Sequence, residues 1–199
     1  FHAASVGEIK SIIPIIKNLI ENNKNLEILL TTVTLSAGNL VQAEIKNYEN
    51  IYHRYFPLDV GFLIKKFLVE WNPQVIFLVD SEIWPNLIFE SNEKEIPLAL
   101  INARITKKTF NRWMLIPNTA KSIFEKFKLC LASNNETQNY LEKLNVKNIN
   151  FYGNIKLINT TDKSLSNEQH DPILKKSKVW CAISTHKGEE EFCLEVHKI

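Results

Sequence analysis

Short apolar runs alternate with helical patterns along most of the chain. Strands are predicted over residues 26–32, 51–55, 74–79, 98–101, 129–132 and 149–152, and residues 1–5 are predicted to end another buried strand. Apolar residues recur at helical spacing over residues 9–21, 37–45, 61–71, 85–91, 112–126 and 136–144. Several strands, such as VIFLV and LALI, are apolar throughout, as expected where helices cover both faces of a parallel sheet. The pattern predicts an α/β fold.

The periodic pattern loosens after Asn154. The tract NTTDKSLSNEQHDP is polar and carries no apolar period, so it is predicted to be a linker or an exposed loop. A further strand is predicted over residues 179–183, followed by the turn STHKG and a helix that begins with glutamates. We therefore expect a first domain over residues 1–156, a linker over 157–175 and the start of a second domain over 176–199. Because the chain begins without Met and inside a strand, we expect it to be an internal piece of a longer protein.

Composition and charge exclude some classes of partner. The 199 residues are 45% hydrophobic and 23% charged, as in an ordinary globular protein, and the net charge of +2 is too small to indicate a nucleic-acid partner. The three cysteines, Cys130, Cys181 and Cys193, lie far apart in apolar contexts, which favours free thiols in a reducing compartment. No apolar run approaches the ~20 residues that a transmembrane helix requires.

Basic residues are concentrated in one part of the chain. Between residues 104 and 128 seven basic side chains stand against the single acid Glu125, with aromatic and apolar residues among them. Such a face could contact an anionic membrane surface or a phosphorylated lipid, or it could be an ordinary solvated helix face. The basic residues are Arg104, Lys107, Lys108, Arg112, Lys121, Lys126 and Lys128.

Two glutamates follow predicted strands and begin predicted helices. Glu8 ends the motif SVGE, where Gly7 is expected to supply a tight turn, and Glu82 lies in SEIWPN after the strand VIFLVD. Open parallel sheets bind their ligands at the carboxyl ends of the strands, so both carboxylates could face one crevice. Glu8 could instead only complement a helix dipole, and Glu82 could only cap the helix that begins at Pro85.

Other strand ends carry weaker signals. In INARIT, Asn102 and Arg104 follow a strand, and Arg104 could bind a phosphate or pair with a neighbouring acid. In YGNIK, Gly153 permits close backbone approach and Lys156 could offset negative charge on a leaving phosphate, or be an exposed lysine of the linker.

The tract AISTHKGEEE combines small residues, hydroxyls and an imidazole before a helix. Its backbone N–H groups could bind a phosphate, although the tract lacks the Gly-Lys-Ser/Thr ending of a P-loop. A metal at His186 is not expected because no H-E-x-x-H spacing occurs, and no G-x-S-x-G elbow supports a serine triad.

Taken in order, FHAASVGE, SEIWPN, INARIT, GNIK and STHKGEEE resemble the Kdo transferases of lipopolysaccharide synthesis. The resemblance runs over the whole chain. It implies a GT-B glycosyltransferase with two Rossmann-like domains, of which only the start of the second is present. It further implies inverting transfer of Kdo from the substrate CMP-Kdo to a phosphorylated lipid A precursor, without a metal or other cofactor. The implied location is the cytoplasmic face of the bacterial inner membrane.

The resemblance also implies roles for individual residues. Glu8 matches the proton acceptor of the family, and Glu82 and Lys156 match residues that stabilise the transition state. The donor-side tract is matched by Ser184, Thr185, His186, Gly188 and Glu189. The basic face, with Arg104, Lys107, Lys108 and Arg112, would suit the lipid acceptor or the membrane.

The chain departs from the family pattern in TTVTLSAG, in CLASNNET and after GNIK, which affects expectations about the acceptor. A GT-B transferase with another nucleotide-sugar donor and a non-catalytic α/β module that binds an anion remain as alternatives.

Overall fold

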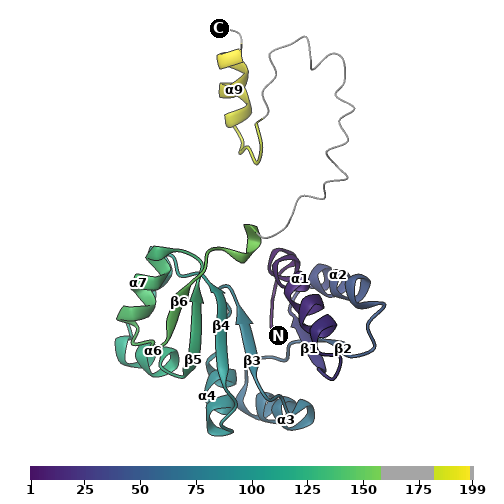
Figure 1. Cartoon of the computed structure of the whole chain (residues 1–199). Coiled ribbons are helices and arrows are strands. Elements are labelled where there is room, and N and C mark those ends of the chain that lie inside the picture. Colours follow the sequence, from purple (N-terminus) through teal and green to yellow (C-terminus); the bar gives the residue numbers. More distant parts are fainter. Residues whose placement is uncertain (158–181, 198–199) are drawn as a thin grey trace. The chain divides into compact units, whose positions relative to one another are not determined.

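The computed structural model describes residues 1–157 and 182–197. The chain divides into two compact units, Phe1–Asn159 and Thr160–Ile199, and each is described by itself (Figure 1). The linker predicted over residues 157–175 lies, apart from Leu157, outside the described residues, and so does most of the strand predicted over 179–183. Ala182 and Ile183 have no strand conformation.

The first unit is built on parallel strands. Strands β1 and β2 pair with each other, and β3, β4, β5 and β6 pair in that order. His2 bridges the two groups, because it forms parallel bridges to both Thr31 in β1 and Leu78 in β3. The strands are β1 (Ile28–Thr32), β2 (Ile51–Tyr55), β3 (Ile76–Val79), β4 (Leu98–Ala103), β5 (Phe127–Ala132) and β6 (Ile149–Phe151).

Counting the segment around His2 as the central strand, the order across the sheet is β2, β1, the His2 segment, β3, β4, β5 and β6. The chain first winds outward in one direction and then, from β3, in the other. This is the doubly wound arrangement of Rossmann-type sheets, whose ligands bind where the direction reverses. The reversal lies between the His2 segment and β3.

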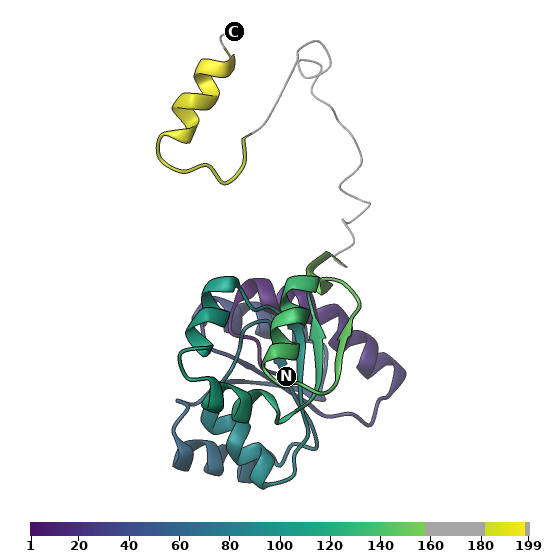
Figure 2. The ribbon, with the colours of Figure 1, turned by 90° about the vertical axis from the view of Figure 1, so that its left-hand side faces the viewer.

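Helices cover both faces of this sheet (Figures 1 and 2). Helices α1 (Val6–Asn22) and α2 (Leu35–Ile45) share one core cluster with Val79 and Ile101. The other face packs Leu78 and Leu100 against the remaining helices. Those helices are α3 (Gly61–Trp71), α4 (Pro85–Glu93), α6 (Pro117–Phe124) and α7 (Asn135–Lys143). The continuously apolar strands are explained by burial on both faces.

Two local predictions were wrong. The single helix predicted over residues 112–126 is two helices, α5 (Lys107–Trp113) and α6, because Pro117 begins the second at its first turn. Gly7 does not form a tight turn: it lies within the first turn of α1, and a Cβ there would meet no atom within 4 Å. The positive-φ glycine of the first unit is Gly153, at φ 93°.

The described part of the second unit is small. After Ser184 (φ 60°) and Gly188 (φ 96°), which both adopt left-handed backbone conformations, the chain forms helix α9 (Glu189–His197). In the first unit, a short 3₁₀ turn, η1 (Ile155–Leu157), follows β6. Within residues 1–157 and 182–197, no helix has the length and apolar character needed to cross a bilayer.

Candidate active site

The reversal point of the sheet gathers ionisable side chains from three segments. Glu8 comes from the first turn of α1, Asp80 and Glu82 from the segment after β3, and Lys156 from η1. Glu82 and Asp80 lie near enough to Glu8 for their charges to affect its ionisation. The structure thus brings together the three residues predicted to be catalytic, and adds Asp80.

Glu8 is fixed by hydrogen bonds at the beginning of α1. Its Oε2 accepts from the backbone N–H of Ala4 (2.7 Å) and Ser5 (3.4 Å), and its Oε1 accepts from the Ser5 hydroxyl (3.0 Å). The Ser5 oxygen in turn accepts from the Glu8 N–H, which completes a capping box. The helix-end role predicted as an alternative for Glu8 is therefore real. It also holds the carboxylate in one place.

The surroundings of Glu8 favour its protonated form more than water does. The side chain is buried, with 9% exposed, and this burial raises the pKa of Glu8 above 4.5. The hydrogen bonds from Ser5 and Ala4 lower the pKa in part, and the negative charges of Glu82 and Asp80 raise it. A carboxylate that is positioned and made more basic in this way is suited to accept a proton.

Asp80 and Asn102 connect two neighbouring strand ends to Lys156. Both residues have left-handed backbone conformations (φ 64° and 53°), which Asp and Asn tolerate better than most residues. The Asn102 Nδ2 donates to Asp80 Oδ1 (3.1 Å), and the Asn102 Oδ1 accepts from the Ile155 N–H (3.1 Å). Lys156 Nζ then binds Asp80 Oδ2 at 2.5 Å. Asn102 therefore fixes the turn that presents Lys156.

Glu82 is held from the other side by aromatic residues. Its Oε2 lies 3.3 Å from His2 Nε2 and accepts from Trp84 Nε1 at 2.9 Å. Its side chain is 16% exposed. Glu82 does not cap α4. The Asn86 and Leu87 N–H groups at the beginning of α4 bind the carboxylate of Asp59 instead, at 3.0 and 2.9 Å.

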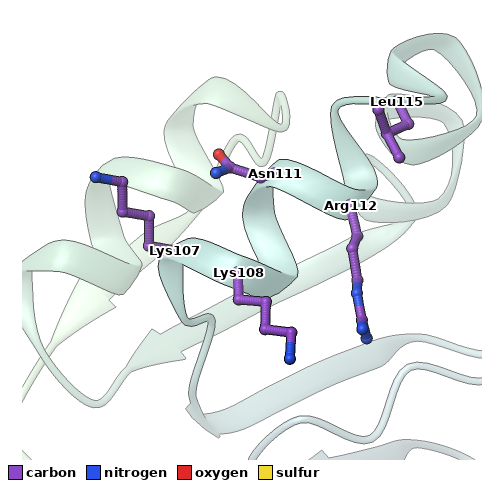
Figure 3. A pocket seen from close by; sticks show the side chains of 5 residues that line it. All are labelled: Lys107, Lys108, Asn111, Arg112 and Leu115. Carbon is purple, nitrogen blue, oxygen red and sulfur yellow. The ribbon is translucent and has the colours of Figure 1, made fainter.

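The basic face lies on a separate surface. Lys107, Lys108 and Arg112 line a shallow hollow on α5 together with Asn111 and Leu115, and the hollow shares no lining residue with the carboxylate cluster (Figure 3). Figure 3 shows Lys108 and Arg112 extending in the same direction, one helical turn apart. These basic side chains, like that of Arg104, form no ion pair with any residue in the described parts of the chain. Exposed apolar side chains follow at once: Met114, Leu115 and Ile116.

The predicted donor-side tract lies in the second unit. The His186 N–H donates to Glu189 Oε2 (2.8 Å), and the Thr185 hydroxyl donates to Glu190 Oε1 (2.7 Å). The His186 Nδ1 lies 3.2 Å from the Ser184 carbonyl oxygen. With Gly188 these residues form a compact, solvent-exposed turn at the beginning of α9.

Sequence reasoning missed Asp80, His2 and the link from Asn102 to Lys156. The acid directly after VIFLV could have been noticed, since it follows a buried strand in the same way as the other candidates. Among residues 1–157 and 182–197, no group of three or more His, Cys, Asp and Glu side chains is arranged to hold a metal ion.

Comparisons with known proteins point to one family. Residues 1–159 match the family model of 3-deoxy-D-manno-octulosonic-acid transferase (Kdo transferase). A mitochondrial 3-deoxy-D-manno-octulosonic acid transferase of Arabidopsis thaliana is 34% identical over all of this chain and 46% of its own length. The transferase of Haemophilus influenzae is 31% identical over 99% of this chain and 47% of its own length. The chain thus spans about half the length of these relatives.

A solved structure shares the fold. A crystal structure described as that of a UDP-N-acetylglucosamine 2-epimerase from Listeria monocytogenes superposes with a TM-score of 0.58 at 12% identity, over 88% of this chain and 50% of that one. The predicted fold class, α/β with parallel sheets of the GT-B type, is confirmed.

Proposed function

The chain belongs to the 3-deoxy-D-manno-octulosonic acid transferase family, and we propose that the whole protein transfers Kdo from CMP-Kdo to a phosphorylated lipid A precursor. The observation that carries this proposal is the cluster at the reversal point of the sheet. It combines a buried, hydrogen-bonded Glu8 whose pKa is raised with a lysine and two further carboxylates. Family membership supports Kdo as the transferred sugar, and the cluster supports the chemistry.

In the proposed reaction Glu8 is the general base. A hydroxyl group of the acceptor attacks the anomeric carbon of Kdo, its proton passes to Glu8, and CMP departs from the opposite face, so that the configuration inverts. Fixing the carboxylate by the Ala4 and Ser5 donors restricts its motion, which favours proton transfer at a defined position.

Lys156 is the proposed counter-charge for the departing phosphate. One of its three N–H donors is committed to Asp80, which leaves two for a substrate. Asp80 also holds the ammonium in place, so the cation needs little reorganisation when negative charge develops. The exposed turn from Ser184 to Glu189 is the proposed donor-side contact, through its backbone N–H groups and hydroxyls.

The decisive experiment measures CMP release from CMP-Kdo in the presence and absence of a lipid A precursor, with the full-length protein. We expect acceptor-dependent release that falls about 10²- to 10⁴-fold in Glu8→Gln, the usual contribution of a general base. Glu21→Gln, an exposed glutamate of the same helix, is the matched control and should keep wild-type activity. Release that survives Glu8→Gln would move the base to another residue. Inhibition by UDP instead of CMP would indicate another donor.

The basic face on α5 is the proposed contact with the acceptor phosphates or with an anionic membrane, at the cytoplasmic face of the inner membrane. Its support is the clustering, beside exposed Leu115, of three cations that form no ion pair with any residue the structure describes. Replacing Lys107, Lys108 and Arg112 by Gln should weaken binding to anionic liposomes. The charge-matched control replaces the exposed Lys24, Lys46 and Lys147. Equal effects of the two triple variants would overturn this contact.

If the protein is instead a non-catalytic module that binds an anion, no variant alters a reaction. In that case the wild type would bind CMP-Kdo or the lipid without releasing CMP. Binding without release, measured by calorimetry beside the CMP assay, separates this function from a transferase.

A further inference from the structure

We infer that His2 is a positioning residue that holds the carboxylate of Glu82, committing one oxygen to the protein and leaving the other for a substrate. This inference rests on the proposed transferase function. His2 is 2% exposed and lies in the central segment of the sheet, between β1 and β3. On the β3 side, the His2 N–H donates to the Phe77 carbonyl (2.8 Å) and the His2 carbonyl accepts from the Val79 N–H (3.1 Å). On the β1 side, the Ala3 N–H donates to the Thr31 carbonyl (3.0 Å).

Two donors converge on the same oxygen of Glu82. His2 Nε2 lies 3.3 Å from Oε2, and Trp84 Nε1 donates to Oε2 at 2.9 Å. The Oε1 atom has no hydrogen-bond partner among residues 1–157 and 182–197. Two donors on one oxygen fix the rotation of the carboxyl group and leave the second oxygen available to a ligand.

The contacts of the imidazole require a proton on Nε2 when Glu82 is ionised. Nδ1 lies 2.9 Å from the Thr31 hydroxyl. If the Thr31 hydroxyl donates to Nδ1, Nδ1 is the acceptor nitrogen of the ring and the proton is on Nε2. If the hydroxyl instead donates to the Phe1 carbonyl (3.2 Å), Nδ1 must donate to the hydroxyl and the ring must carry both protons. In both arrangements Nε2–H donates to Glu82.

Aromatic rings hold the imidazole in this orientation. The Phe56 ring lies 4.3 Å from the His2 ring, and the Trp84 ring packs edge-on at 5.9 Å. Phe56 and Trp84 also contact each other, at 5.3 Å. The side chain that donates to Glu82 from one side therefore packs against the side chain that donates from the other. A buried histidine with only a packing role would not need this convergence on one carboxylate oxygen.

The test compares two replacements of His2 in the full-length protein. His2→Gln keeps an N–H donor near the position of Nε2, and His2→Leu keeps the volume without a donor. We expect His2→Leu to lower kcat for CMP release about 10- to 100-fold, the loss that corresponds to one hydrogen bond to a charged group, and His2→Gln to recover most of it. The matched control is His53→Leu, which loses a similar bond to Thr32 (2.9 Å) and should change kcat little.

A double-variant cycle shows whether His2 acts through Glu82. In a Glu82→Gln background, His2→Leu should cause no further loss. Equal losses for His2→Leu and His2→Gln, or losses that multiply with that of Glu82→Gln, would overturn the inference. If His2→Leu fails to fold, Thr31→Val and Trp84→Phe test the same chain of contacts, and both should lower kcat while the melting temperature stays near that of the wild type.

A spectroscopic readout keeps the inference independent of activity. In protein carrying ¹⁵N-labelled histidine, Glu82→Gln should move the Nε2 resonance of His2, and Glu21→Gln should leave it unchanged. A His2 Nε2 resonance whose chemical shift is the same in Glu82→Gln as in the wild type would overturn the inference, even if the enzyme is active. If the wild type releases no CMP but Glu82→Gln still moves the His2 Nε2 resonance, the proposed function is overturned. The contact between His2 and Glu82 is then still supported.

Discussion

Two helices of this chain begin with the same local arrangement and differ in what surrounds it. In α1, Glu8 accepts from the N–H of Ser5, three residues earlier, and in α9, Glu189 accepts from the N–H of His186 in the same way. The side chain of Glu8 is 9% exposed and has two carboxylates nearby, whereas that of Glu189 is 61% exposed. The same capping interaction thus holds a buried carboxylate in α1 and an exposed one in α9, and it is the burial that raises the pKa of Glu8.

The largest difference between Glu8 and Glu189 is expected when each side chain is shortened by one methylene group. Glu8→Asp should lower kcat for CMP release on the order of 10²-fold, because a general base displaced by about 1 Å loses its alignment with the reacting hydroxyl. Glu189→Asp should leave kcat within about threefold and act mainly on KM for the donor. Steady-state kinetics with varied CMP-Kdo check both. Equal kcat losses would show that burial does not distinguish the two carboxylates.

The next difference concerns the ion pairs of the two regions. Lys156→Met leaves the buried carboxylate of Asp80 without its cation and should lower stability by about 1–2 kcal/mol, less than for a fully buried pair because Lys156 is 35% exposed. His186→Ala removes an exposed contact and should cause no measurable loss. Chemical denaturation of the full-length protein measures both. Lys65→Met, which breaks the pair with Glu90, is the control on the first unit.

A smaller effect is expected in the dependence of stability on pH. The folded pKa of Glu8 is raised above 4.5, so ionising Glu8 costs more in the folded than in the unfolded protein. The favourable contribution of protonated Glu8 to folding stability is fully present below pH 4.5, and it is lost as the pH rises through the pKa of Glu8 in the folded protein. Relative to the wild type, Glu8→Gln should therefore gain melting temperature between pH 4 and pH 8.

Ser5→Ala sharpens the same measurement. It removes the hydroxyl donor that lowers the pKa of Glu8, so the pKa should rise further and the transition should move to higher pH. A difference between wild type and Glu8→Gln that stays constant with pH would contradict the electrostatic description of the site.

The smallest expected effect is in thiol reactivity. Cys130 is fully buried in β5, and burial raises the pKa of its thiol to about 12, so roughly 10⁻⁴ of it is ionised at pH 8. Cys193 on α9 is partly exposed. Alkylation of the native protein, read by peptide mass mapping, should label Cys193 and spare Cys130 until the protein unfolds. Rapid labelling of Cys130 would show that the first unit opens locally.

Much of the fold was predictable because the apolar residues of its sequence mark the buried faces of the strands and helices. Two buried strands, β3 (ending at Val79) and β4 (beginning at Leu98), are recognisable in the sequence because apolar residues run through them without interruption. The helix break at Pro117 was also readable, since proline favours the first turn of a helix, but the apolar spacing across residues 112–126 suggested continuity. The spacing of apolar residues alone does not locate a break between two short consecutive helices.

The candidate site was predictable in part. Glu8 and Glu82 could be identified because each lies where a strand gives way to a helix. The contact between His2 and Glu82 joins residues 80 positions apart, and it depends on β3 lying beside the His2 segment, which no local pattern specifies. Asp80, which has a left-handed backbone conformation, is likewise joined to the neighbouring strand end: its N–H donates to the Ile101 carbonyl, and its carbonyl accepts from the Arg104 N–H.

The carboxylates at the beginnings of α1 and α4 have a consequence for phosphate binding at these two helices. In many doubly wound domains the first helix offers its free N–H groups to a nucleotide phosphate. Here the Glu8 carboxylate accepts from the N–H groups of Ala4 and Ser5 just before α1, and the Asp59 carboxylate accepts from the Asn86 and Leu87 N–H groups in the first turn of α4. A carboxylate of the protein therefore lies at the beginning of each of these two helices, where a phosphate would meet a like charge.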